Sequence, residues 1–211
     1  MLRNLTQYVW ACGRGVAVPL AFISACLPAP AVQAANTSPR LVIAIRDYAN
    51  LPPKALDVAK AQVSKIFEKA GVTVQWSEFA APAAGGEVWP AAWVKLLPDS
   101  MARRLRRSQG ALGCSAGDQA YIFTDDVLAA AVHAEINYAM TLGQVMAHEI
   151  GHFLLGQNHE PTGIMSPYLG SSEFQEMRTG HLLFHDRQAK KIRERLRTQQ
   201  AAATSALVAQ R

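Results

Sequence analysis

Three histidines and one glutamate lie in one short stretch of the chain at spacings that suit a metal site. His148 and His152 are four residues apart, so on a helix both imidazoles share a face and can reach one ion. Glu149 follows the first histidine, where a general base for an activated water belongs. Gly156 can end the helix and let the chain bring His159 back. The pattern predicts one zinc ion (Zn2+) held by His148, His152 and His159, with a fourth position left for water.

The predicted helix around this motif, residues 140–155, is long and apolar and carries almost no charge. Histidine and glutamate are rarely buried unless they are paired or bind something, so their presence in a core helix favours a metal. The alternative is a pair of hydrogen-bonded structural histidines. Met165 follows in the segment Gly-Ile-Met, and its place after the three histidines suggests that it lies beneath the site in a tight structural turn.

The stretch resembles the metzincin zinc metallopeptidases, whose pattern is HExxHxxGxxH followed by a Met-turn. The match uses His148, Glu149, His152, Gly156, His159 and Met165. The segments KIFEKAGVTVQW, AYIFTDDV and LGQVMAHEIGHFLLG resemble a small exported bacterial branch of such enzymes. The resemblance extends in outline over 41–196 and is specific only around the motif. It implies an α+β, metzincin-like fold in which a small twisted mixed β-sheet packs on helices, including the zinc-binding active-site helix and a C-terminal helix.

The chain departs from the metzincin pattern in one place. Three residues, 153–155, separate His152 from Gly156, where the pattern has two. One more helical residue rotates the exit by ~100° and advances it by ~1.5 Å. We expect the following turn to absorb this change, because a loop can move a side chain more easily than a buried helix can lose a ligand. Otherwise the third ligand would be one of five other residues: Asn158, Glu160, His133, His181 or His185.

The resemblance implies a zinc-dependent endopeptidase (a metalloendopeptidase) that hydrolyses peptide bonds through a metal-bound water, with Glu149 as general base. We expect an extended protein or peptide substrate to lie along the strand 119–123 by strand addition. The alternative is an exported zinc-binding protein of metzincin-like fold without protease activity, which a fourth protein ligand would favour. A metal-dependent RNA-processing enzyme is disfavoured by export and by Glu149. Tyr168 lies late for the tyrosine that follows the Met-turn in metzincins, and we interpret it as a surface or packing residue.

The first 34 residues have the organisation of a secretory signal peptide. Arg3 and Arg14 precede an apolar run, 16–27, that is shorter than the ~20 residues of a membrane-spanning helix. Small residues follow it, and we expect cleavage after Ala34. The protein would then be exported, either periplasmic or secreted. The alternative is a lipobox at ISAC, in which Cys26 is lipidated and anchors the protein to the membrane; only in that case do we expect contact with a membrane.

Composition indicates one domain, because 211 residues of which half are apolar can bury one core of ordinary size. We assign 35–200 to this catalytic domain and expect a disordered tail at 201–211. Of the three cysteines only Cys114 follows the signal peptide, so no internal disulfide is available, and we interpret it as a buried, inert thiol. Removing two arginines leaves a net charge of +5 − 2 = +3. The basic runs 103–107 and 190–197 lack interleaved aromatic residues, so we expect no nucleic-acid partner. We also expect a monomer.

The hydrophobic pattern predicts the order β-α-β-β-β-α-α around the motif, with a short basic helix in addition. The expected strands are 41–49, 72–79, 91–98 and 119–127, and the expected helices are 54–70, 100–109, 140–155 and 186–197, with loops at 111–117 and an irregular stretch before the last helix. The acid pair Asp125 and Asp126 then falls at a solvated strand end, since two carboxylates are too few for calcium.

Overall fold

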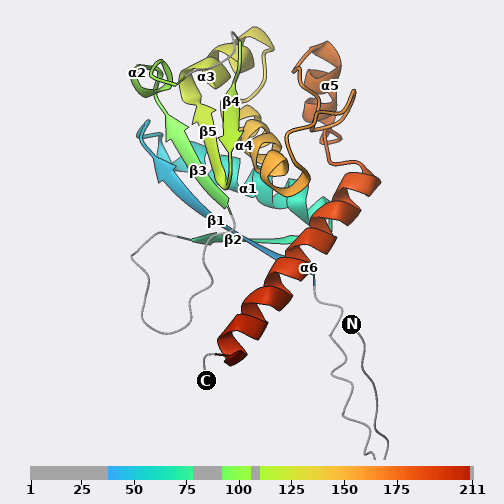
Figure 1. Ribbon diagram of the computed structural model, residues 1–211. Coiled ribbons are helices and arrows are strands. Elements are labelled where there is room, and N and C mark those ends of the chain that lie inside the picture. The colour runs from blue at the N-terminus through green and yellow to red at the C-terminus, as the bar shows by residue number, and fades with distance from the viewer. Residues whose placement is uncertain (1–37, 78–91, 106–109, 210–211) are drawn as a thin grey trace, which may run out of the picture. The chain divides into compact units, whose positions relative to one another are not determined.

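A five-stranded mixed β-sheet forms the centre of the described part of the chain (Figure 1). The computed structural model describes residues 38–77, 92–105 and 110–209, so the predicted signal peptide lies outside them. The strands are β1 (Arg40–Asp47), β2 (Thr73–Ser77), β3 (Ala92–Leu97), β4 (Gly113–Ala116) and β5 (Gln119–Phe123), in the order β2-β1-β3-β5-β4. All neighbours are parallel except β4, which is antiparallel to β5. The predicted mixed sheet packed on helices is confirmed.

The helices of the described residues are α1 (Pro53–Lys69), α2 (Asp99–Ala102), α3 (Thr124–His133), α4 (Tyr138–Leu155), α5 (Ser171–Thr179) and α6 (Asp186–Ala209). Helix α4 packs against α1, α3 and α6, and it also contacts strands β3, β4 and β5. It is therefore a core helix, as was predicted for the helix that carries the motif. None of the described helices has the length and apolar content that a bilayer crossing requires.

The main core forms where α1 and α4 meet one face of the sheet. On α1, Ala59, Val63 and Phe67 recur at helical spacing and are fully buried. On β1, Leu41 and Ile43 are two residues apart, so both point to the helix side of the pleated strand. Burying each large apolar side chain contributes about 1.5–3 kcal/mol before the entropy cost is subtracted. This core fixes α4 against the sheet, and with it the motif.

Helix α4 is defined by a cap at one end and a glycine at the other. The Asn137 side chain accepts a hydrogen bond from the Met140 backbone N at 3.1 Å, which satisfies a free amide of the first turn. Gly156 has φ of 96°, a value that disfavours residues with a Cβ, and its N–H donates to the His152 carbonyl at 2.8 Å. Near the middle, Gly143 lets α1 approach so closely that a Cβ there would lie 2.6 Å from the Ala59 carbonyl oxygen.

The predicted loop at 111–117 is wrong, because it contains the edge strand β4. The strand is short and built from small residues, which carry little β-strand signal. Gly117, with φ of 60°, turns the chain back into β5, and Cys114 pairs with Tyr121. Since β5 thus lies between β3 and β4, the expectation that 119–123 offers a free edge is also wrong. The free edge on this side belongs to β4.

The predicted strand 119–127 ends early, at Phe123, and helix α3 begins at Thr124. Asp125 and Asp126 occupy the first helical turn, where negative charge interacts favourably with the helix dipole. The Asp125 carboxylate also accepts a hydrogen bond from the backbone N of Asp99 at 2.6 Å. The acid pair is therefore at the start of a helix and not at a strand end as predicted, while Asp125 is exposed, as expected.

The C-terminal part of the chain is more helical than expected. Helix α5 lies within the stretch predicted to be irregular. Its residues Phe174 and Met177, three positions apart, are buried. Helix α6 begins at Asp186 as predicted but continues to Ala209, through residues expected to be a disordered tail. Ile192 and Leu196 anchor its first part in the core, and the alanine-rich part that follows has high helix propensity. The basic helix expected at 100–109 is reduced to α2, with 106–109 outside the described residues.

Candidate metal centre

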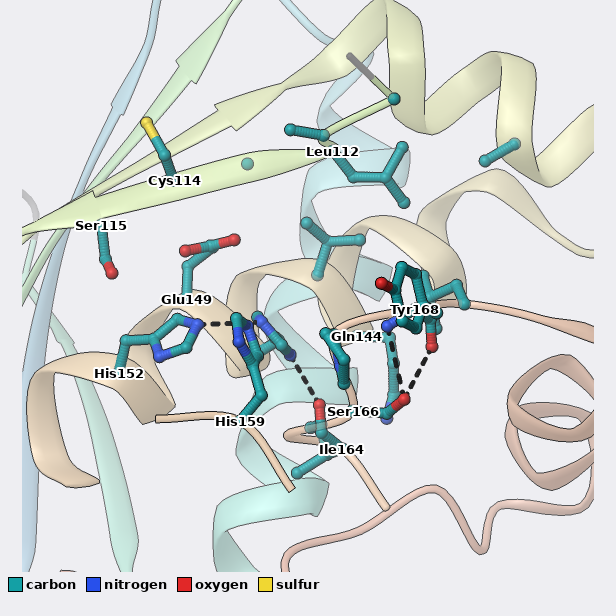
Figure 2. A pocket seen from close by; sticks show the side chains of 18 of the residues that line it. Leu112, Cys114, Ser115, Gln144, Glu149, His152, His159, Ile164, Ser166 and Tyr168 are labelled. Atoms are coloured by element: carbon teal, nitrogen blue, oxygen red, sulfur yellow. Dashed lines mark hydrogen bonds between the residues drawn. The ribbon is translucent and has the colours of Figure 1, made fainter. Parts of the chain in front are cut away.

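The three predicted histidines come together in the structure (Figure 2). His148 and His152 lie four residues apart on α4, and their ring centroids are 4.7 Å apart. His159 approaches from the loop after Gly156, as Figure 2 shows. One ring nitrogen from each histidine lies within 4.8 Å of the other two. The Nε2 atoms of His148 and His152 are 3.1 Å apart. The loop has thus absorbed the extra helical residue, as the sequence led us to expect.

Backbone carbonyls fix the orientation of two of the imidazoles. His148 Nδ1 lies 2.6 Å from the Ile164 carbonyl oxygen, and His152 Nδ1 lies 3.1 Å from that of Gly156. A carbonyl oxygen can only accept, so each Nδ1 carries the proton and donates it. Each neutral ring then keeps its Nε2 lone pair free on the side facing the other histidines. Such outer hydrogen bonds are the usual way in which proteins orient histidine ligands.

Burial keeps these imidazoles uncharged. Burial lowers the pKa of His148 to about 4, its proximity to His152 and His159 acts in the same direction, and the bond to Ile164 opposes the shift. Burial also lowers the pKa of His152. Both rings are therefore neutral at physiological pH, which is the form that binds a metal cation.

Glu149 lies beside the histidines with one oxygen that has no partner among the described residues. Its side chain is only 6% exposed, and its Oε2 makes no hydrogen bond. Burial raises the pKa of this carboxyl group to about 8. A buried carboxyl group without a partner is costly, so its presence next to three imidazoles points to a cation or a polar ligand as its partner.

Glu149 fits into this position because the neighbouring strand β4 has a glycine there. A Cβ on Gly113 would lie 2.9 Å from both Cγ and Oε1 of Glu149. The edge strand thus approaches the acid more closely than any other residue type would allow. Sequence reasoning missed Gly113 because it assigned the segment to a loop; a glycine at a tight backbone contact gives no periodic signal.

Met165 lies directly against helix α4. It is fully buried, and a Cβ on Gly151 would lie 2.5 Å from its sulfur. The backbone N of Glu160 donates to the Met165 carbonyl at 2.9 Å, which closes the segment 160–165 into a tight turn. The turn therefore rests on the same helix that carries His148 and His152.

The other candidate ligands lie outside the histidine group. Among the described residues, only His148, His152 and His159 have ligand atoms that are close enough together to hold one ion. This group does not include Glu160, His133, His181 or His185. His185 instead bonds Thr162, and the Glu160 carboxylate lies 3.4 Å from Arg187. Asn158, the remaining alternative, is exposed. The fourth coordination position is thus left without a histidine, cysteine or carboxylate from the described residues.

Cys114 and Tyr168 do not join the histidines. Figure 2 shows the Cys114 side chain on the side of β4 away from Glu149, while Ser115 points toward His152. Cys114 packs with a small cluster around Leu97 and Phe123, and burial raises the pKa of its thiol. The interpretation of Cys114 as a buried thiol implied that it is fully enclosed, whereas the side chain is only half-buried. Tyr168 is 78% exposed, in agreement with a surface residue.

A cavity of about 720 Å³ opens next to the site. His148, Glu149, His152 and His159 line one part of it, and apolar side chains line another, among them Leu112, Val145, Leu169 and Phe174. Gln144, one helical turn before His148, also lines it and is only 2% exposed. Its amide is fully engaged, donating to the Leu182 carbonyl at 2.6 Å and accepting from Gln62 at 3.2 Å.

These residues fit a zinc ion. Three imidazole nitrogens are a typical zinc donor set, and a catalytic site adds a free position and an acid nearby. Apolar packing of α4 does not explain why a buried Glu149 Oε2 has no hydrogen-bond partner, whereas a nearby cation would explain it.

No family model matches the chain, and no curated protein matches it. Among solved structures, it is similar to archaemetzincin from Methanopyrus kandleri, with 16% sequence identity, a TM-score of 0.44, and coverage of 77% of this chain and 98% of that one. Values this low do not show a family, so the chemistry of the site rests on the side chains described above.

Proposed function

We propose that this protein is a zinc-dependent endopeptidase of the metzincin type. The observation that supports it most is the convergence of three imidazole nitrogens beside a buried glutamate whose Oε2 has no partner. A purely structural histidine cluster would not need that acid. The free edge of β4 and the adjoining cavity give a peptide substrate room to bind.

His148, His152 and His159 would hold the ion, the first two through Nε2. Zinc, when bound, supplies a Lewis acid that polarises a carbonyl group and lowers the pKa of water. The carbonyls of Ile164 and Gly156 keep the two helical imidazoles in the ligating tautomer, so little reorganisation is required when the metal arrives.

Glu149 would act as the general base. Its carboxylate accepts a proton from the attacking water at an Oε atom and then passes it to the leaving nitrogen. A bound positive ion would lower the pKa of this carboxyl group from its raised, metal-free value and would so make the carboxylate available near neutral pH.

The substrate would add to the sheet at β4. Among the described residues this strand has one partner, β5, so its other side can offer backbone hydrogen bonds to an extended peptide. Since Gly113 of β4 touches Glu149, a peptide on that edge passes close to the base. The apolar part of the cavity then offers space for one substrate side chain.

Replacing Glu149 tests this proposal. Glu149→Ala should keep zinc, because Glu149 is not one of the three grouped ligands, and should lose nearly all hydrolysis of casein. His159→Ala is the matched variant, and it should weaken zinc binding itself. Unchanged casein hydrolysis by Glu149→Ala would refute the proposal. Stoichiometric zinc in a chain that cleaves no peptide would favour the non-catalytic zinc-binding alternative.

We also propose that the protein is exported as a monomer to the periplasm or the medium, acts on proteins or peptides, and binds no nucleic acid. The support for export is the signal-like sequence at 1–34. Mass analysis of the mature N-terminus would distinguish cleavage after Ala34 from a lipidated Cys26. A protein that keeps its uncleaved N-terminus and stays in the cytoplasmic fraction would contradict both proposed locations.

A further inference from the structure

The turn that orients His148 rests on a segment far along the chain, residues 183–185. The backbone N of Ile164 donates to the Leu183 carbonyl at 3.1 Å. His185 Nε2 lies 3.0 Å from the Thr162 carbonyl oxygen and 3.2 Å from the Thr162 hydroxyl. Because a carbonyl can only accept, the Nε2 of His185 carries a proton and donates it. The turn is thus bonded to this segment on both sides of Gly163.

The contact between the turn and His185 requires a glycine at position 163. It has φ of 76°, and a Cβ there would lie 2.8 Å from His185 Nε2 and 3.1 Å from the Leu183 carbonyl oxygen. The imidazole of His185 therefore lies against a bare Cα. Its ring could not approach the turn this closely at any other residue type.

The same turn carries the groups that set the metal centre. The Ile164 carbonyl accepts from His148 Nδ1 at 2.6 Å. The bond from Glu160 N to the Met165 carbonyl closes the turn directly after His159. A displacement of the turn would therefore move the partner of one proposed ligand and the attachment point of another.

The segment that contacts the turn is itself anchored at both ends. The Gln144 amide of α4 donates to the Leu182 carbonyl at 2.6 Å. The backbone N of His185 donates to the Gln188 side-chain oxygen at 2.8 Å, and Gln188 is buried at the start of α6. His185 thus connects a fixed support to the turn.

We propose that His185 is a positioning residue of the metal centre: its Nε2–H bond to the Thr162 carbonyl holds the turn whose Ile164 carbonyl aims His148. This inference rests on the proposed function, in which the three grouped histidines hold zinc. His185 does not touch the metal or the substrate, so its effect is expected in metal affinity and coordination geometry.

Two amide variants test the hydrogen bond directly. In His185→Gln, the amide nitrogen reaches the position of Nε2, so the donor is retained; in His185→Asn, it falls short by one methylene. His185 is exposed, so neither change disturbs the core. His181→Asn is the matched control, since His181 is also exposed and outside the metal group. The full chain would be stripped of metal and titrated with zinc against a chromophoric chelator.

We expect His185→Asn to weaken zinc affinity about 10-fold, the lower end of the range for residues that orient metal ligands. His185→Gln and His181→Asn should stay within about 2-fold of the parent. Substitution with cobalt(II) gives a second measurement, because its visible absorption reports ligand geometry. The bands should shift in His185→Asn alone.

Parent-like zinc affinity and cobalt spectrum in His185→Asn would overturn the inference. Equal losses in both amide variants would also overturn it, because the bond would not be what matters. A parent chain that binds no stoichiometric zinc, or a His148→Ala variant that binds it unchanged, would instead overturn the proposed function from which the inference starts.

Discussion

Burial of Glu149 should make the metal-free protein lose stability as the pH rises. The pKa of this carboxyl group is raised from 4.5 to about 8 in the folded chain. Between these values the folded state holds a proton that the unfolded chain has released. The free energy of unfolding therefore falls with increasing pH across that window, and the loss is complete above the folded-state pKa.

The size of the effect follows from the shift. One pKa unit corresponds to about 1.4 kcal/mol. From pH 6.5 to pH 8, the fall due to Glu149 is therefore about 2 kcal/mol. The lowered pKa of His148 contributes in the opposite sense, because its folded form binds fewer protons than the unfolded chain. A Glu149→Gln variant keeps the histidine contributions, so the difference between the two proteins isolates the carboxyl group.

The assay is urea unfolding of the parent and Glu149→Gln proteins after metal removal, at pH 6.5 and pH 8. Relative to the variant, the parent should lose about 2 kcal/mol between the two conditions. Saturating zinc should remove most of this difference, because a nearby cation lowers the pKa of the carboxyl group. A difference that changes by less than about 0.5 kcal/mol without metal would refute the reasoning, since the carboxyl group would then titrate alike in both states.

Three other substitutions test contacts described above. Gly113→Ala should destabilise the fold by about 1–3 kcal/mol in thermal unfolding, because the new methyl group displaces Glu149. For the same reason it should reduce peptide hydrolysis more than zinc affinity. Normal hydrolysis would show that the Glu149 side chain adapts to the methyl group. Gly143→Ala should also cost about 1–3 kcal/mol in urea unfolding, since its methyl group meets the Ala59 carbonyl oxygen, with zinc affinity retained in whatever fraction stays folded. Cys114→Ser should leave zinc affinity unchanged in a chelator titration, and a weaker affinity would place the thiol closer to the metal than the structure does.

Local sequence carried enough information to locate the proposed ligands. The run 140–155 is apolar and helical, so two histidines four residues apart had to share a face of a buried helix. The return of His159 could be expected, but its geometry could not be worked out, because it depends on a glycine conformation and on a turn of several residues. The actual φ of Gly156 is a consequence of how that turn packs, which no local pattern encodes.

The contacts around the ligands could not be read from the sequence. Gly113 meets Glu149 only after β4 pairs with β5 and the sheet packs on α4. His185 could be considered only as a spare ligand, since its bond to Thr162 joins segments that have no shared periodicity. Short strands of small residues and turns held by single hydrogen bonds depend on tertiary structure, whereas long amphipathic helices reveal themselves locally.

The close fit between Gly113 and Glu149 also locks the register of the sheet edge. Side chains on a strand alternate between faces, so a slip of β4 by a single position would swing the side chain of Leu112 or Cys114 into the volume that the acid occupies. Correct strand pairing and correct placement of Glu149, the proposed base, therefore depend on the same steric contact. We expect a misregistered hairpin to abolish the proposed activity even where the rest of the chain had folded.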